Sequence, residues 1–64
     1  MWSDHDIEAA ARLLVVQRGV CAPSHAAIRA ALLIKEGNPR GGADWLRVKL
    51  AAENLLASAA DAAD

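Results

Sequence analysis

Residues 3–18 read SDHDIEAAARLLVVQR, and this stretch is the most informative part of the chain because it carries apolar side chains on two sides of a helix. At the helical period, one stripe contains Ile7, Ala10, Ala11 and Leu14. A second stripe, roughly half a turn away, contains Ala9, Leu13 and Val16. A surface helix needs one stripe to pack on its own core. The second stripe therefore predicts contact with a partner rather than a chemical reaction.

The chain has 64 residues, which is enough for one domain and too few for a large core. Domains of this size are usually stabilised by disulfides, a metal or a partner chain. Cys21 is the only cysteine, so an intramolecular disulfide is impossible. His5 and His25 are the only histidines and belong to no metal-ligand pattern. We therefore expect no metal and no cofactor, and we expect self-association or docking onto a larger protein.

Composition favours a cytoplasmic protein that does not bind nucleic acid or membranes. A single cysteine suits a reducing compartment, no export signal follows Met1, and no apolar run approaches the ~20 residues that span a bilayer. The net charge is −1, whereas nucleic-acid scaffolds carry a basic surplus. With two Trp, no Tyr and no Phe, the chain offers little for stacking on bases.

An all-α fold is predicted, as a compact three-helix domain with helices at about residues 3–18, 24–36 and 43–59. Residues 1–64 are expected to form a single domain with a frayed tail at 60–64. The second helix has two apolar faces, which is expected if it lies between the other two. The expected core stripe of the third helix contains Trp45, Val48, Ala52, Leu55, Leu56 and Ala59.

The helix ends carry recognisable signals. Ser3 is the expected N-cap of the first helix, and Asp6 resembles the second half of a capping box. Gly19 offers a left-handed position after that helix, and Pro23 is expected to delay the next one until Ser24, its predicted N-cap. Trp2 is expected to pack on the first helical turn or to be exposed at an interface.

No catalytic residue is predicted, so the protein is not expected to be an enzyme. No nucleophile stands beside a base, and Cys21 follows a helix C-terminus, where the dipole disfavours a thiolate. Cys21 is expected to be a buried or half-buried apolar residue. Residues 37–42, GNPRGG, contain the glycines of a phosphate cradle but lack the lysine and hydroxyl of a P-loop. A helix stop followed by a chain reversal explains them.

The order Arg18-Gly19, Ala22-Pro23, Gly37 and then Gly42 before Trp45 resembles a group of short bacterial helical proteins of unknown function. In that group a His-Gly pair ends the first helix, a Gly-Asp turn ends the second, and Trp opens the third. The likeness covers about residues 6–57. This chain departs from it with Arg18 in place of His and Asn38 in place of Asp. The resemblance implies a helical fold and implies no activity.

The predicted function is protein–protein contact by a small regulator or inhibitor, as a homodimer or docked on a larger protein. An inhibitor of mobile-element origin that blocks a larger bacterial machine fits this description. Ala-rich helix faces permit close approach, which suits a homodimer. Leu46 and Leu50 would extend the patch if the first and third helices lie side by side. The expected partner-binding residues are Ala9, Leu13, Val16, Val20, Leu46 and Leu50.

A nucleic-acid-binding regulator is the alternative. Three helices permit a helix-turn-helix, with the third helix presenting Arg40, Arg47 and Lys49 to DNA. Two features weigh against it. The expected connection, residues 37–42, is longer than the turn of about three or four residues in that motif. Three basic residues also neutralise few phosphates.

Overall fold

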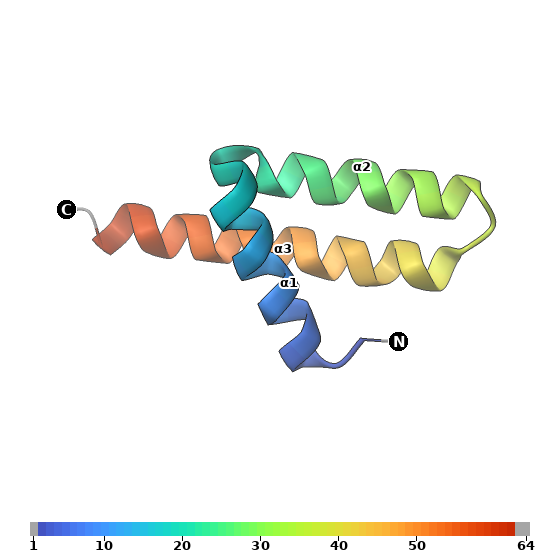
Figure 1. The fold of residues 1–64 in the computed structure, drawn as a ribbon, viewed down its shortest axis with the longest axis horizontal. Coiled ribbons are helices and arrows are strands. Elements are labelled where there is room, and N and C mark those ends of the chain that lie inside the picture. The colour runs from blue at the N-terminus through green and yellow to red at the C-terminus, as the bar shows by residue number, and fades with distance from the viewer. Residues whose placement is uncertain (1, 63–64) are drawn as a thin grey trace.

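The computed structural model describes the backbone of residues 2–62 and the side chains of residues 2–59. Four elements follow one another along the chain: α1 (Asp4–Arg18), the 3₁₀ turn η1 (Gly19–Cys21), α2 (Ala22–Lys35) and α3 (Pro39–Ala62) (Figure 1). All four are helical, which confirms the predicted all-α fold for the described residues. Helical backbone continues without a break from Asp4 to Lys35. The chain is therefore one long, bent helical segment followed by α3, rather than three helices separated by loops.

The start of α1 is capped as the sequence predicted. The backbone N–H of Asp6 donates to Ser3 Oγ at 3.2 Å, and the Ser3 N–H donates to Asp6 Oδ2 at 3.3 Å. Asp4 in the first turn and Arg18 in the last also suit the helix dipole. Gly19 ends α1 with a φ of 59°, a conformation that favours glycine. The bend of the chain begins at this residue.

The bend is shorter than the sequence predicted, because α2 begins at Ala22 and not at Ser24. Pro23 lies in the first turn of α2, where its missing N–H has no helical partner to lose. Ser24 is consequently a helical residue rather than an N-cap. Cys21 occupies the cap position and makes no side-chain hydrogen bond there. The prediction that Pro23 delays the helix was wrong, since the first turn of a helix tolerates proline.

The connection between α2 and α3 spans only residues 36–38. Gly37 has a φ of 89°, and Asn38 caps α3, since its Oδ1 accepts the Gly41 N–H at 3.0 Å. Asn38 followed by Pro39 is a helix-start signal, and α3 accordingly begins four residues before the predicted position. The helix ends at Ala62, three residues after the predicted end. Of the predicted frayed tail, residues 63–64 lie outside the described part of the chain.

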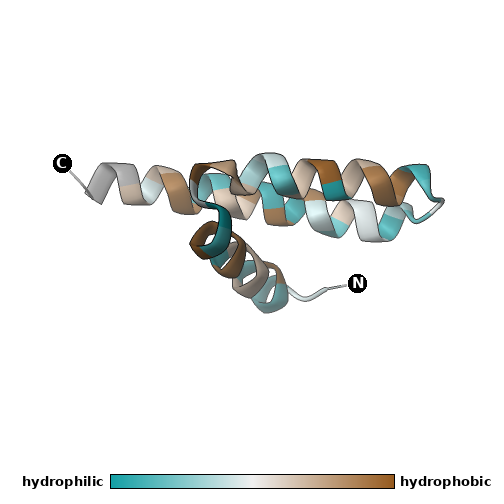
Figure 2. Cartoon of the chain, turned by 45° about the horizontal axis from the view of Figure 1, so that its top comes forward, coloured by the Kyte–Doolittle hydropathy of each residue, from teal (hydrophilic) through white to brown (hydrophobic). Residues whose placement is uncertain are grey.

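The helices α2 and α3 form an antiparallel hairpin, and α1 crosses one side of it (Figures 1 and 2). Most of the packing of α1 is against α3 and little is against α2. The central element is therefore α3, and the prediction that the second helix lies between the other two was wrong. The sharp bend at Gly19 folds α1 across the hairpin instead of alongside α2.

The core of the molecule is built from small side chains. Val48 is its only large side chain that is fully buried among the described residues. Leu14 and Ile7 keep a small exposed fraction, and the other buried apolar residues are alanines: Ala11, Ala22, Ala26, Ala30 and Ala52. In the predicted stripe of α3, Val48 and Ala52 are buried, three residues are half-buried and Ala59 is exposed.

Small residues let the backbones of α2 and α3 approach closely. A Cβ atom added to Gly42 would lie 2.5 Å from Ile34 Cγ1 and 3.0 Å from the Ala30 carbonyl oxygen. Both distances are shorter than ordinary van der Waals contacts. Gly42, which the sequence placed in a loop, is thus a point of close helix–helix contact. Large side chains do not fit there and project outward.

Candidate interaction surface

Many of the large apolar side chains lie on the outside of the molecule. Those that are exposed among the described residues are Trp2, Leu13, Val16, Val20, Ile28, Leu32, Ile34, Leu46 and Leu50. The accessible surface is 4450 Å², whereas a compact monomer of this mass exposes about 3,900 Å². The radius of gyration is 11.8 Å, compared with about 10.7 Å for a compact chain of this length. The fold leaves more surface uncovered than its size requires.

The outer face of α1 is the most exposed of these surfaces, and we define it by Ala9, Leu13 and Val16 of α1 together with Val20 of the adjoining turn η1. Leu13 is 58% exposed, and Val16 and Val20 are each 82% exposed. The opposite stripe of α1 is buried through Ile7, Ala11 and Leu14. The two stripes that the sequence indicated thus have different surroundings, one in the core and one in solvent.

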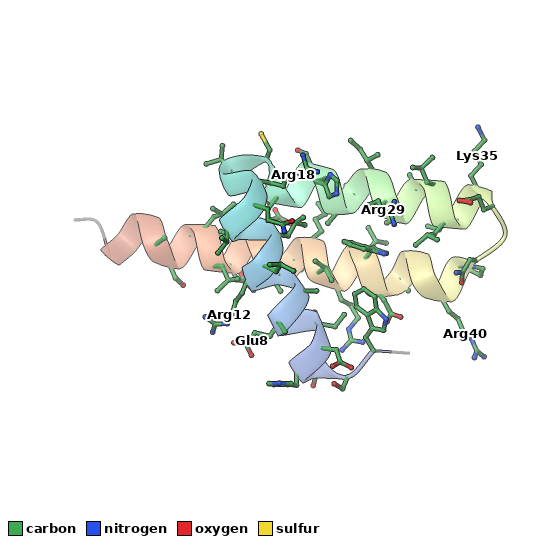
Figure 3. The ribbon with its side chains drawn as sticks, viewed as in Figure 1. Glu8, Arg12, Arg18, Arg29, Lys35 and Arg40 are labelled. Atoms are coloured by element: carbon green, nitrogen blue, oxygen red, sulfur yellow. The ribbon has the colours of Figure 1, made fainter. Side chains whose placement is uncertain are left out.

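Glu8 and Arg12 form an ion pair beside this face (Figure 3). Arg12 Nη2 donates a hydrogen bond to Glu8 Oε1 at 2.6 Å. This hydrogen bond and the charge of Arg12 lower the pKa of Glu8 below its ordinary value of 4.5. Both side chains are mainly exposed, so the pair borders the apolar face without covering it.

Leu46 and Leu50 do not join the outer face of α1. On α3 they project roughly 160° from the buried Val48, because successive residues turn by roughly 100°. Val48 points toward α1 and α2, so the two leucines point away from them. Leu13 and Val16 likewise point away from α3. The structure therefore places the two predicted sets on opposite sides of the molecule, whereas the sequence had suggested one continuous patch.

Sequence reasoning missed three large apolar side chains that are exposed on α2: Ile28, Leu32 and Ile34, the last of them 50% exposed. Ile28 is 61% exposed and Leu32 is 48% exposed, on the side of α2 opposite Ala26. They had been assigned to a face buried between two helices. Their i, i+4 spacing on the side of the helix opposite a stripe of alanines was the sequence signal that could have indicated their exposure. That signal is ambiguous in the sequence, because a sandwiched helix also shows two apolar faces.

The two tryptophans join the beginning of the chain to α3. The Trp2 and Trp45 rings meet edge to face with centroids 5.6 Å apart, and the Arg29 guanidinium lies 5.6 Å from the Trp45 ring centroid. Trp2 was expected to pack on the first turn of α1 or to be exposed. It is 37% exposed, as the second alternative had it, and its ring also contacts Trp45 of α3. Trp45 is half-buried beside the core and is not a free binding anchor.

Of the basic residues proposed for DNA, Arg47 is occupied within the molecule. Its guanidinium pairs with Asp4, lies 3.7 Å from Asp44 and donates to the Trp2 carbonyl oxygen at 3.2 Å. Lys49 is half-buried, while Arg40 is exposed and points away from α2 (Figure 3). The structure thus does not gather the three residues into one free basic surface.

The geometry of the hairpin also differs from a helix-turn-helix, although the original objection about loop length was wrong. The connection has three residues rather than the expected six, because α3 starts at Pro39. However, α2 and α3 lie side by side and antiparallel, whereas the helices of that motif cross at about 90–120°.

The glycine-rich stretch is not arranged as a phosphate cradle. The Gly41 N–H donates to Asn38 Oδ1, and the Gly42 N–H donates to the Asn38 carbonyl oxygen at 3.1 Å. These amides are satisfied by the cap, so they are not available to an anion. Gly42 is also buried against Ile34.

Other chemical features of the surface are modest. An open groove of about 290 Å³ lies between α1 and α3, with Ile7 and Leu55 among its lining residues and Asp4 at its edge. Cys21 is exposed, contrary to the expectation of burial. Within the described residues, no cluster of His, Cys, Asp and Glu side chains has the arrangement of a metal site. None of the described helices combines the length and hydropathy required to cross a bilayer.

Comparison with protein-family models, with curated proteins and with solved structures finds no match. The resemblance to short bacterial helical proteins therefore stays a prediction. The function has to be inferred from the residues described above.

Proposed function

We propose that this protein is a non-enzymatic interaction module, a small regulator or inhibitor that acts through the outer face of α1. In this proposal residues 1–64 form a single three-helix domain in the cytoplasm, where one exposed cysteine suits a reducing environment. The domain works as a homodimer or docks on a larger protein. It uses no metal, cofactor or small-molecule substrate.

One observation carries the proposal: alanines fill the core while Val16 and Val20 are each 82% exposed. A single exposed apolar side chain is ordinary on a protein surface. Here Ala9, Leu13 and Val16 follow one another along one side of α1, as in a helix that docks into an apolar groove, and Val20 follows in the adjoining turn η1. Burying them in a partner would contribute the hydrophobic stabilisation that a core of alanines supplies only weakly.

The valines are also well suited to recognition. Val and Ile side chains have restricted χ1 rotamers in helices, so little side-chain entropy is lost when a partner covers them. The Glu8–Arg12 pair offers charges of both signs at the edge of the face. This composition, an apolar centre with a polar rim, matches the anatomy of protein–protein interfaces.

The test compares wild type with Leu13→Asp/Val16→Asp in sedimentation velocity and in capture from a bacterial lysate, with bound proteins identified by mass spectrometry. Ser24→Asp/Asn54→Asp is the matched control, because it adds the same charge at exposed polar positions. We expect wild type and control to retain the same host protein and the α1 variant to lose it, while sedimentation velocity shows the same oligomeric state for all three proteins. Binding that persists in the α1 variant, or no binding by wild type, would overturn the proposal.

A nucleic-acid-binding function remains the alternative, supported by the three-residue connection between α2 and α3. The same preparations separate the two functions. Contacts with phosphates weaken steeply as salt concentration rises, whereas apolar docking does not. Loss of binding between 50 and 200 mM salt (roughly the range in which phosphate contacts weaken) would favour nucleic acid.

A further inference from the structure

The outer face of α3 lies on the side of the hairpin that α1 does not cover. Its residues are Ala43, Leu46, Leu50, Glu53 and Ala57, all of them exposed. They recur at alternating intervals of three and four, which is the seam spacing of helices that pair in coiled coils. Leu46 is 42% exposed and Leu50 is 60% exposed. Within the described part of one chain, no other element buries this seam.

The neighbouring helix extends this face with small side chains. Ile34 packs beside Gly42 of α3, and Ala31 and Ala27 precede it along the same side of α2. Ile34 is half exposed. The side of the hairpin opposite α1 is therefore a broad surface on two helices, with leucines on α3 and mainly alanines on α2. Such a surface permits another pair of helices to approach closely.

The charges of α3 select the partner. Arg40 and Lys49 lie in its first half, and Glu53 lies in its second half. Arg47, also in the first half, is already paired with Asp4 and lies 3.7 Å from Asp44. The first turn of α3 contains no acidic residue, in contrast to α1, which begins with Asp4 and Asp6. Positive charge near an N-terminus opposes the helix dipole. An antiparallel copy of α3 would place Glu53 and a negative helix end beside Arg40 and Lys49.

We propose that a second copy of this chain packs antiparallel on the outer face of α3, so that two hairpins form a four-helix bundle. The proposal rests on the proposed function as an interaction module and names its self-association surface. The midpoint of α3 falls between Leu50 and Ala51. Full overlap of the two helices then sets Leu50 beside Leu50 of the second copy and Lys49 near its Glu53. Both α1 outer faces stay free for other partners.

A dimer interface of ordinary size would cover only a small part of the chain's surface. A stable interface buries about 800 Å² on each partner, which is less than a fifth of the 4450 Å² exposed here. The two-fold axis makes the contact self-complementary, so each Lys49–Glu53 pair occurs twice. In one chain neither residue lies within ion-pair distance of an opposite charge among the described residues. Glu53 in the middle of an apolar seam would fix the register, as single polar seam residues do in coiled coils.

The test measures the dimer dissociation constant of the full chain by sedimentation equilibrium, in reducing buffer so that Cys21 cannot cross-link. Leu50→Asp should raise the dissociation constant at least about 100-fold, because a charge would be buried at the two-fold axis. Leu13→Asp/Val16→Asp should leave it within about threefold, since rim or distant charges change affinity little. Circular dichroism establishes that each variant keeps its helices.

A charge-reversal cycle keeps the test independent of the leucine variant. Lys49→Glu and Glu53→Lys should each raise the dissociation constant about tenfold at low salt, because each places like charges opposite one another twice. The double variant Lys49→Glu/Glu53→Lys restores opposite charges and should return to within about threefold of wild type. Additive losses in the double variant would overturn the antiparallel arrangement.

The remaining outcomes separate this inference from the proposed function. A wild type that stays monomeric at millimolar concentration overturns the α3 dimer, while docking of α1 on a host protein is unaffected. A dimer that dissociates on Leu13→Asp/Val16→Asp but not on Leu50→Asp also overturns it, and then places self-association on α1. Host-protein capture that persists in Leu13→Asp/Val16→Asp, while Leu50→Asp still abolishes the dimer, overturns the α1 proposal alone.

Discussion

Where α2 meets α3 the side chains are small, and where α1 faces outward they are large. The first region packs Ala26 and Ala30 against α3 and requires glycine at position 42. The second holds Leu13, Val16 and Val20 in solvent. The hydrophobicity of a segment alone therefore does not show whether its side chains lie in the core. Helices that approach closely exclude large side chains, so a chain rich in alanine can bury its smallest apolar residues and display its largest.

The strongest test of this comparison is Gly42→Val, which introduces a side chain where α2 and α3 approach closely. Contact with the Ala30 carbonyl oxygen cannot be relieved by moving a side chain. We expect a loss of about 3 kcal/mol in the free energy of unfolding, at the upper end of overpacking costs. Urea denaturation at fixed protein concentration measures it. Ala59→Val, at an exposed position of the same helix, is the control and should cost a few tenths of a kcal/mol.

Replacing a buried valine and an exposed valine by alanine compares the two regions directly, because the same two methyl groups are removed in each case. Val48 is fully buried, so Val48→Ala should lower the free energy of unfolding by about 2 kcal/mol. Val16→Ala should change it by less than about 0.5 kcal/mol, because the side chain is already in solvent. Similar costs for both variants, measured on the folded monomer, would show that Val16 is packed rather than exposed.

A smaller effect distinguishes the two serines that the sequence marked as caps. Ser3→Ala removes the Oγ that accepts the Asp6 N–H and should cost about 1 kcal/mol. Ser24→Ala should leave stability unchanged or slightly higher, because Ser24 lies inside α2 and alanine is the better helix former. Thermal unfolding followed by circular dichroism compares them. Equal destabilisation by the two changes would mean that α2 starts at residue 24 after all.

The smallest expected effect concerns the ion pair at the edge of the α1 outer face. The pKa of Glu8 is lowered by Arg12, so the pair contributes stability above pH 4.5, and this is lost as pH falls through the folded-state pKa. Glu8→Gln should therefore lower the melting temperature slightly at pH 7 and have less effect at pH 3. A difference between the proteins that does not shrink at pH 3 would contradict this assignment.

Local signals predicted the parts of the fold that depend on neighbouring residues. The capping box of Ser3 and Asp6 and the positive φ of Gly19 were predicted because side chain and backbone groups a few residues apart determine them. The start of α3 was missed although Asn38-Pro39 is an equally local signal. The glycines that follow were interpreted as loop residues, when Gly42 serves a contact with α2 that is 8–12 residues earlier in the chain.

The candidate surface was predicted only in part. The exposure of Leu13 and Val16 follows from two opposed stripes on a helix that packs on one side. The exposure of Ile28 and Leu32 was not predicted, since two apolar faces also fit a central helix. The separation of Leu46 and Leu50 from α1 required the crossing of α1 over the hairpin, which no spacing in the sequence encodes.

Three features could be predicted from the sequence: the helical fold, the capped start of α1 and the two apolar stripes of α1. Helix propensity, capping and periodicity depend on residues a few positions apart, so they can be predicted without knowing the tertiary structure. Three other features required the tertiary structure. They are the central position of α3, the contact of α2 with α3 through alanines and Gly42, and the exposure of large aliphatic side chains to solvent. Those outcomes depend on how closely two distant backbones can approach, and the bend at Gly19 sets which helices meet.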